Sequence, residues 1–201
     1  QMSVKCEAMT ANKKPLCGVS AAVFSGGLIG FEATVGGGLP VVSTIRNMQA
    51  VGDEISEIRA MASGTLGYVL SFVERGEPFA AAVKSAMAHG YTDPDPREDL
   101  GGADVARKAL FLHWMLGGTM SFEDIRVDNL VPEALRDCPV EEFLTRLTHD
   151  RSIAARLGAD LRGRKRRMRY LARITKTSIE IGLREVDATD PFASLQGPVN
   201  M

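Results

Sequence analysis

Apolar residues recur along the chain with two different periods, which predict a mixture of helices and strands. Helical spacing or helix-boundary residues mark five segments: residues 40–51, 66–74, 78–89, 104–116 and 139–160. Alternation, or a short apolar run, marks four predicted strands: 31–35, 54–62, 168–175 and 179–186. A short polar link makes the last two strands a hairpin. The order has no regular strand–helix–strand rhythm, so we predict an α+β domain, a mixed sheet with helices packed on it.

Composition limits the class of protein. The chain has 201 residues, which corresponds to one domain or slightly more. Hydrophobic residues make up 45% and charged residues 24%, values typical of a globular protein. Apolar runs such as 109–112 are far shorter than the roughly 20 residues that span a membrane. We therefore expect no contact with a membrane.

The cysteines and histidines give no sign of a disulfide framework or a metal centre. The three cysteines (Cys6, Cys17 and Cys138) lack CxxC spacing, and the three histidines (His89, His113 and His149) lack the spacing of metal ligands. An odd number of cysteines fits a reducing compartment, so we expect a cytoplasmic protein. His113 and Trp114 are expected to be packing residues of the helix after Asp104.

Basic residues are concentrated late in the chain. Residues 151–176 contain ten Lys or Arg and a single acid, Asp160. The run 162–169 could suggest nucleic-acid binding, but only Tyr170 follows it as a base-stacking aromatic. We interpret the run as a solvated connection between a helix and a strand, and expect no nucleic-acid partner.

The acidic segment 91–104 is the strongest candidate for chemistry. Two prolines and a glycine pair predict a loop without regular structure, which leads into a helix at about Asp104. Asp104 and Lys108 are four residues apart and share one helix face. The ordinary interpretation is a helix N-cap followed by a surface ion pair. Four further carboxylates on the stiff loop (Asp93, Asp95, Glu98 and Asp99) favour a site that binds an ammonium group while the lysine moves protons.

Two further features are weak by themselves. Lys13 and Lys14 form a small cationic pair, which is most often solvated. Glu32 precedes the glycine-rich turn 36–38, whose carbonyls could join its carboxylate in coordinating a hard cation. An ordinary strand-to-helix turn is the alternative interpretation.

Four motifs together resemble the homoserine dehydrogenase family, especially its fungal members. In chain order they are Thr10-Ala-Asn-Lys-Lys14, Glu32-Ala-Thr-Val-Gly-Gly-Gly-Leu-Pro40, Ser63-Gly-Thr-Leu-Gly-Tyr68 and the segment from Gly90 to Lys108. The tail Asp190-Pro-Phe-Ala-Ser-Leu-Gln-Gly197 is also similar to a later region of the family.

The resemblance implies interconversion of L-homoserine and L-aspartate 4-semialdehyde with NAD or NADP, in threonine, methionine and isoleucine biosynthesis. It implies that Lys108 is the catalytic acid/base and that Lys13 is a second active-site lysine near substrate and cofactor. Asp93 and Asp104 match substrate-binding carboxylates, although the family usually has a glutamate at the position of Asp93. Gly90 matches a position where the backbone approaches the cofactor.

The resemblance also implies a sodium site and a homodimer. Glu32 and the carbonyls of Val35, Gly37 and Leu39 match the ligands of a monovalent cation, and the dimer would form through the sheet. By the same comparison, residues 1–30 are a remnant of the nucleotide-binding domain and its connection. Residues 31–190 are the catalytic domain, and 191–201 begin the return to the nucleotide-binding domain, most of which is absent. The alternative is a catalytically silent remnant that acts only as a dimerising domain.

Overall fold

The fold consists of a four-stranded mixed sheet with helices packed against it. The computed structural model describes residues 8–9, 29–157 and 166–198. The sheet has the order β3-β5-β6-β4, with β3 (Ile58–Ala60), β5 (Arg166–Ile174), β6 (Ile179–Asp187) and β4 (Arg126–Val127). β5 and β6 form an antiparallel hairpin, β3 runs antiparallel to β5, and β4 runs parallel to β6. The predicted α+β class is confirmed.

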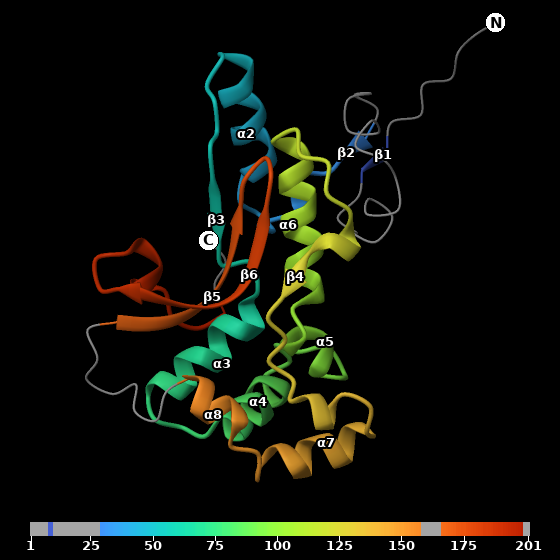
Figure 1. Cartoon of the computed structure of the whole chain (residues 1–201), viewed down its shortest axis with the longest axis vertical. Coiled ribbons are helices and arrows are strands. Elements are labelled where there is room, and N and C mark those ends of the chain that lie inside the picture. Colours follow the sequence, from blue (N-terminus) through green and yellow to red (C-terminus); the bar gives the residue numbers. More distant parts are fainter. Residues whose placement is uncertain (1–7, 10–28, 158–165, 199–201) are drawn as a thin grey trace, which may run out of the picture.

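The helices are α2 (Val41–Ala50), α3 (Gly64–Glu74), α4 (Phe79–Ala88), α5 (Arg97–Leu100), α6 (Ala103–Met115), α7 (Val140–Leu147) and α8 (Ser152–Leu157). Short 3-10 helices cover Glu32–Thr34 (η2), Phe122–Asp124 (η3), Glu133–Leu135 (η4) and Pro191–Ser194 (η5). Two short strands, β1 (Ala8–Met9) and β2 (Ile29–Gly30), form a separate parallel pair. In Figure 1, α2 lies at the opposite end of the molecule from α7 and α8. Among the described residues, no helix has the length and apolarity needed to cross a membrane.

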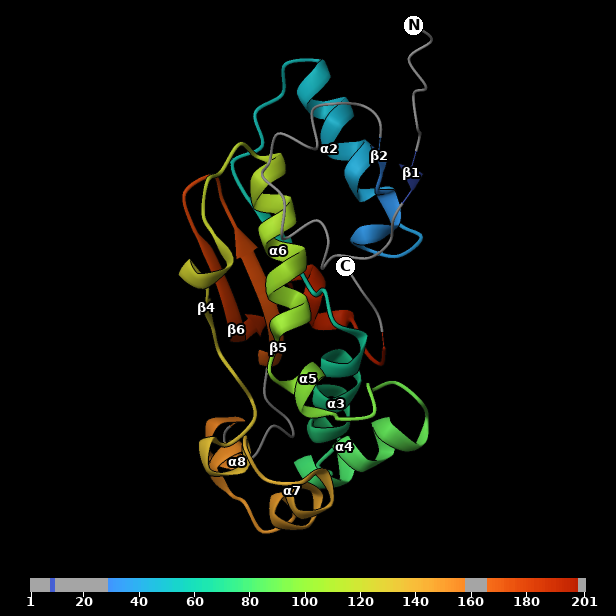
Figure 2. The same cartoon turned by 90° about the vertical axis from the view of Figure 1, so that its right-hand side faces the viewer.

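Helix α6 lies along one face of the sheet (Figure 2). Its buried positions include Val105, Ala109 and Leu112, which repeat at three- and four-residue intervals and so form one apolar stripe. Alternate residues of the hairpin are also buried in the same core, among them Ala172 and Ile181. The apolar face of the helix and the apolar face of the hairpin therefore pack together in one hydrophobic layer.

Most elements predicted from the pattern are confirmed. The helices expected over 40–51, 66–74, 78–89 and 104–116 are present with small shifts at their ends, and 139–160 contains two helices. The hairpin is also present, and each of its strands is one residue longer than predicted. The strand expected over 54–62 is confirmed only at Ile58–Ala60. Two-residue β4 was not predicted, since so short a strand leaves almost no periodic signal.

Three predictions were wrong. Residues 31–35 form no strand: β2 ends at Gly30, and η2 follows because Glu32 turns back to bind the start of α2. The loop 91–104 contains a helical turn, α5, which begins directly after Pro96, a position that proline tolerates. The solvated connection expected over 162–169 does not extend to Arg169, which is only 2% exposed within β5.

His113 is fully buried and joins three parts of the fold, as its expected packing role requires. Its Nδ1 lies 2.7 Å from the carbonyl oxygen of Thr175 in the hairpin turn, and its Nε2 accepts a hydrogen bond from the Met120 backbone N–H at 3.2 Å. The ring therefore carries its proton on Nδ1. A Cβ on Gly118 would lie 2.1 Å from His113 Nε2, so only glycine fits there.

We predict that Gly118→Ala lowers the free energy of unfolding by about 1–3 kcal/mol, because the new methyl group overlaps the buried imidazole. The midpoint of urea denaturation measures this change, provided that the slope stays constant. Gly38→Ala is the matched control, because a Cβ on Gly38 meets no atom within 4 Å in the described part of the chain. Equal midpoints for the two variants would contradict the placement of His113.

Candidate active site

The connection from β3 to α3 forms one wall of the site. Ser63 is the N-cap of α3, in extended conformation, and its side chain accepts a hydrogen bond from the Leu66 N–H at 3.2 Å. This interaction satisfies an N–H at the start of the helix and ends the preceding extended segment at a defined point. Ala62, whose carbonyl takes part in the site, directly precedes this cap, and Thr65 lies in the first turn of α3.

Lys108 reaches this connection from α6. Its Nζ donates to the Ala62 carbonyl oxygen at 2.5 Å and lies 2.9 Å from Asp104 Oδ2. The Lys108 side chain is 15% exposed and that of Asp104 is 45% exposed. The ion pair predicted from the four-residue spacing is confirmed, but its lysine is mostly buried rather than on the surface.

Asp104 is not the N-cap of α6, which corrects the ordinary interpretation of its position. The cap is Gly102, with φ of +74°, and Asp104 lies in the first turn. A Cβ on Gly102 would lie 2.3 Å from the Tyr170 hydroxyl, so the turn needs glycine both for its backbone angle and for space. An acid in the first turn interacts favourably with the N–H groups at the helix start.

Asp99 and Thr65 also belong to this group of side chains. Thr65 Oγ1 lies 2.9 Å from Asp99 Oδ1 and 2.5 Å from the Tyr91 carbonyl oxygen. Asp99 Oδ2 accepts the Asp93 backbone N–H at 2.8 Å. In the sequence, Asp99 is one of several acidic loop residues, and nothing distinguishes it from the others. Thr65 is uncharged, so the pattern of charged residues does not indicate it as a site residue.

Burial raises the pKa of Asp99 above its ordinary value. The hydrogen bonds from Asp93 N–H and Thr65 act in the opposite direction, while the nearby carboxylates of Asp93 and Asp104 raise the pKa further. The structure therefore brings Asp93, Asp99 and Asp104 close enough to interact electrostatically. We call these three residues and Lys108 the carboxylate–lysine cluster.

Of two other predicted site residues, Gly90 and Lys13, only Gly90 lies within the described residues. Gly90 has φ of +71°, and a Cβ there would meet no atom of the described residues within 4 Å, so none of these residues fills the space beside its backbone. Lys13 lies outside the described residues, and its predicted role stays a prediction.

Asp95 has a structural role rather than a place in the cluster. It accepts hydrogen bonds from the Arg97 guanidinium, which lower the pKa of the Asp95 carboxyl. The same guanidinium donates to the carbonyls of Arg136 and Cys138, so the pair ties the acidic loop to the segment before α7.

Glu32 caps helix α2. Its two carboxylate oxygens accept the backbone N–H groups of Val42 and Ser43 at 3.0 and 2.9 Å. The Leu39 carbonyl, another predicted cation ligand, accepts the Val41 N–H at 2.9 Å. Carboxylate and carbonyl oxygens have further lone pairs and are the donors that hard cations prefer, so the residues fit such an ion chemically. Within the described ranges, no group of three or more His, Cys, Asp or Glu side chains is arranged to hold a metal.

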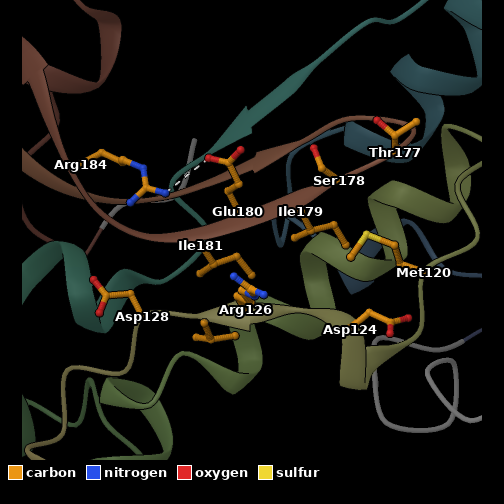
Figure 3. Close-up of a pocket in the computed structure, with 11 residues that line it drawn as sticks. Met120, Asp124, Arg126, Asp128, Thr177, Ser178, Ile179, Glu180, Ile181 and Arg184 are labelled. Atoms are coloured by element: carbon orange, nitrogen blue, oxygen red, sulfur yellow. Dashed lines mark hydrogen bonds and ion pairs between the residues drawn. The ribbon is translucent and has the colours of Figure 1, made fainter.

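A separate cleft of about 530 Å³ lies between β6 and the segment that contains β4 (Figure 3). Its acids already have partners: Asp124 accepts from Ser121, Asp128 pairs with Arg156, and Glu180 is near Arg184. None of its lining residues belongs to the carboxylate–lysine cluster. The cleft is therefore distinct from the candidate active site.

The fold and the cluster together define an α+β domain with a buried lysine among carboxylates. The family model described as homoserine dehydrogenase matches residues 40–201. A homoserine dehydrogenase of Schizosaccharomyces pombe is 35% identical over 217 aligned positions, covering 100% of this chain and 58% of that protein. A chloroplastic bifunctional aspartokinase/homoserine dehydrogenase of Zea mays is 38% identical, covering 85% of this chain and 19% of that protein.

Comparison with solved structures also finds proteins with a similar fold. A crystal structure of a protein of unknown function from Candida auris has a TM-score of 0.86 at 30% identity, covering 98% of this chain and 60% of that one. A hyperthermophilic archaeal homoserine dehydrogenase shares the fold, with a TM-score of 0.67 at 21% identity, covering 96% and 52%. The chain belongs to the homoserine dehydrogenase family. It spans a little over half the length of the fungal relative and about a fifth of the bifunctional plant protein.

The pKa shift of Asp99 predicts a specific dependence of stability on pH. A folded-state pKa above 3.8 means that the wild type loses stability, relative to Asp99→Asn, as pH rises from about 3.8 through the folded pKa. Urea denaturation of both proteins across this range measures the difference in unfolding free energy.

Asp190→Asn is the control with the opposite sign. Hydrogen bonds from Arg59 and the Phe192 N–H lower the pKa of Asp190, so its contribution is present above 3.8 and is lost as pH falls through the folded pKa. A pH-independent difference for Asp99→Asn would contradict the burial of that carboxyl.

Proposed function

We propose that the protein carrying this chain interconverts L-homoserine and L-aspartate 4-semialdehyde with NAD or NADP. The main support for this proposal is the carboxylate–lysine cluster. It combines a lysine that could donate a proton with carboxylates that could bind the ammonium group of the substrate. Family membership supplies the reaction class, and the cluster supplies groups suited to its chemical demands.

Lys108 is the proton donor in the proposed reduction. NAD(P)H, when bound, supplies the hydride that adds to the aldehyde carbon. The Lys108 ammonium gives a proton to the carbonyl oxygen as negative charge develops there, and a neutral amine remains. Ala62 and Asp104 occupy two of its three N–H groups, which leaves one to reach the substrate oxygen. In the reverse direction the neutral amine accepts the hydroxyl proton.

Asp93, Asp99 and Asp104 suit the ammonium group that homoserine and the semialdehyde share. Three acids beside one lysine leave an excess of negative charge, and mutual repulsion already raises the pKa of Asp99. A bound ammonium group relieves this repulsion and gains charge-assisted hydrogen bonds. The shorter side chain of Asp93, where the family usually has glutamate, places its carboxylate about one methylene farther from the ligand.

Other features of the proposal rest on the resemblance and on family membership. Gly90, with no described residue against its backbone, would let a nicotinamide cofactor approach, and the archaeal structure named above was solved in complex with NADPH. Lys13 would lie near both substrate and cofactor. The homodimer, the cytoplasmic location and the role in threonine, methionine and isoleucine biosynthesis are further parts of the proposal.

Lys108→Met is the direct test of the proton-transfer role. In the full-length protein we expect kcat for homoserine oxidation to fall by about 10²–10⁴-fold. The unfolding free energy should change by less than about 1 kcal/mol, because Asp104 remains half exposed. Absorbance of NADPH or NADH follows turnover, and urea denaturation follows stability.

Lys84→Met is the matched control, since Lys84 is an exposed lysine whose Nζ lies 3.3 Å from Thr148 Oγ1, outside the cluster. It should retain wild-type turnover. Near-full activity of Lys108→Met would show that the proton comes from another group. A folded but inactive wild type would instead favour the silent dimerising domain.

We also propose the sodium site at Glu32 and the carbonyls of Val35, Gly37 and Leu39. Replacing choline chloride by sodium chloride at constant ionic strength should stabilise the wild type, by roughly 1.4 kcal/mol at a sodium concentration ten times the dissociation constant. Glu32→Gln should lose this increment, while Glu77→Gln, at an exposed position, should keep it. Equal stability of the wild type in both salts would overturn the cation site and leave Glu32 as a helix cap.

A further inference from the structure

The segment 190–198 runs from the end of the hairpin back to α3, and we call it the strap. It includes η5 and packs against the sheet through Phe192 and Ala193, which form a small second core with Met61, Leu171 and Val186. Leu171 alternates with Tyr170 and Ala172, which belong to the core on the α6 side, so the strap covers the opposite face of the sheet.

Arg169 holds the strap in place from within β5. All five of its N–H donors have acceptors: the guanidinium bonds the carbonyls of Phe192 (2.9 Å), Ala193 (2.8 Å) and Leu195 (3.1 Å), the Met168 carbonyl (2.8 Å), and Glu74 Oε1 (2.6 Å). The Arg169 and Glu74 side chains are only 2% and 6% exposed. One buried side chain thus fixes three carbonyls of one short segment and the last residue of α3.

The strap borders the segment that anchors Lys108. At one end, Phe192 belongs to the same small core as Met61, the residue before Ala62. At the other end, the Gly197 N–H donates to Ser71 Oγ at 3.0 Å, and a Cβ on Gly64 would lie 3.4 Å from the Pro198 carbonyl oxygen. The strap therefore lies next to the segment 61–65 at two points, Met61 and Gly64, and the Ala62 carbonyl lies between them along the chain.

We propose that Arg169, paired with Glu74, is a positioning residue of the active site, which acts through the strap to fix the Ala62 carbonyl and hence Lys108. This inference rests on the proposed function of Lys108. Arg169 lies in the basic run that composition alone suggested was solvated, and it has no contact with the carboxylate–lysine cluster among the described interactions.

An ion pair that only stabilised the fold would not need hydrogen bonds from Arg169 to three strap carbonyls. A buried pair can often be replaced by apolar residues without loss of stability, whereas removing one partner leaves an unpaired buried charge. Only arginine offers five donors in a planar fork, and three of the five are used on strap carbonyls. Lysine at this position keeps the charge beside Glu74 but has three donors at most.

The test compares Arg169→Lys, the double variant Arg169→Met/Glu74→Leu, and the control Arg146→Met in the full-length protein. Arg146 forms an exposed pair with Glu142, so its loss should change nothing. For Arg169→Lys we expect a stable fold and a fall in kcat of about 10–100-fold, the scale of a displacement near 1 Å, with a much smaller change in KM for homoserine. The double variant removes the charges together and should behave in the same way.

Hydrogen exchange gives a readout that does not depend on activity. Amides of residues 62–66 and 192–197 should exchange faster in both Arg169 variants, while amides of the hairpin stay protected. Wild-type kcat together with unchanged exchange in Arg169→Lys would overturn the proposal. So would a stable double variant with full kcat, because the Arg169–Glu74 pair would then not be needed to position Lys108.

Failure of the proposed function is distinguishable from failure of this inference. If the wild type does not turn over homoserine but the exchange of residues 62–66 rises in the Arg169 variants, the strap still positions the Ala62 connection and the reaction assigned to Lys108 is wrong. If turnover is normal and exchange is unaffected, the positioning role is wrong and the proposed function stands.

Discussion

The packing of α6 against the β5–β6 hairpin is the constraint on which the rest of the structure depends. It buries the apolar stripe of the helix, and His113 adds a hydrogen bond from the helix to the hairpin turn. With one face of α6 committed to the sheet, Lys108 must leave the helix toward the β3–α3 connection, where the Ala62 carbonyl receives it. The direction of the candidate catalytic lysine is thus a consequence of hydrophobic packing several ångströms away.

The electrostatics of the site follow from the same arrangement. The acidic loop is stiffened by its prolines and held by Arg97, Thr65 and its own backbone, so its carboxylates cannot separate to relieve their repulsion. Burial and nearby carboxylates raise the pKa of Asp99, and in the proposed function an ammonium-bearing ligand would reduce this electrostatic repulsion. Asp95, in contrast, is neutralised by Arg97 and serves the loop rather than the ligand. Carboxylates close together in sequence therefore take different roles because of their different neighbours.

Sequence patterns predict local structure well where the spacing of apolar residues stays regular over a long helix or strand. Helix α6 and the hairpin were found because each has a long, regular apolar pattern. The apolar pattern of residues 31–35 fits a strand, but the segment forms none because the Glu32 carboxylate binds N–H groups ten and eleven residues later. Helix α5 has a single turn, and so short an element leaves no periodicity to detect.

The α+β class, the order of most elements, the Asp104–Lys108 pair and the family can all be predicted from the amino-acid sequence. They depend on neighbours within a few residues or on motifs read directly. Three features follow instead from long-range packing: Thr65 contacts Asp99, Lys108 is mostly buried, and Arg169 is enclosed by the strap. Those contacts join residues 23 to 95 positions apart, at distances set by the packing of the whole fold. The charge of Arg169 suggested exposure, but burial is permitted here because every one of its donors finds an acceptor.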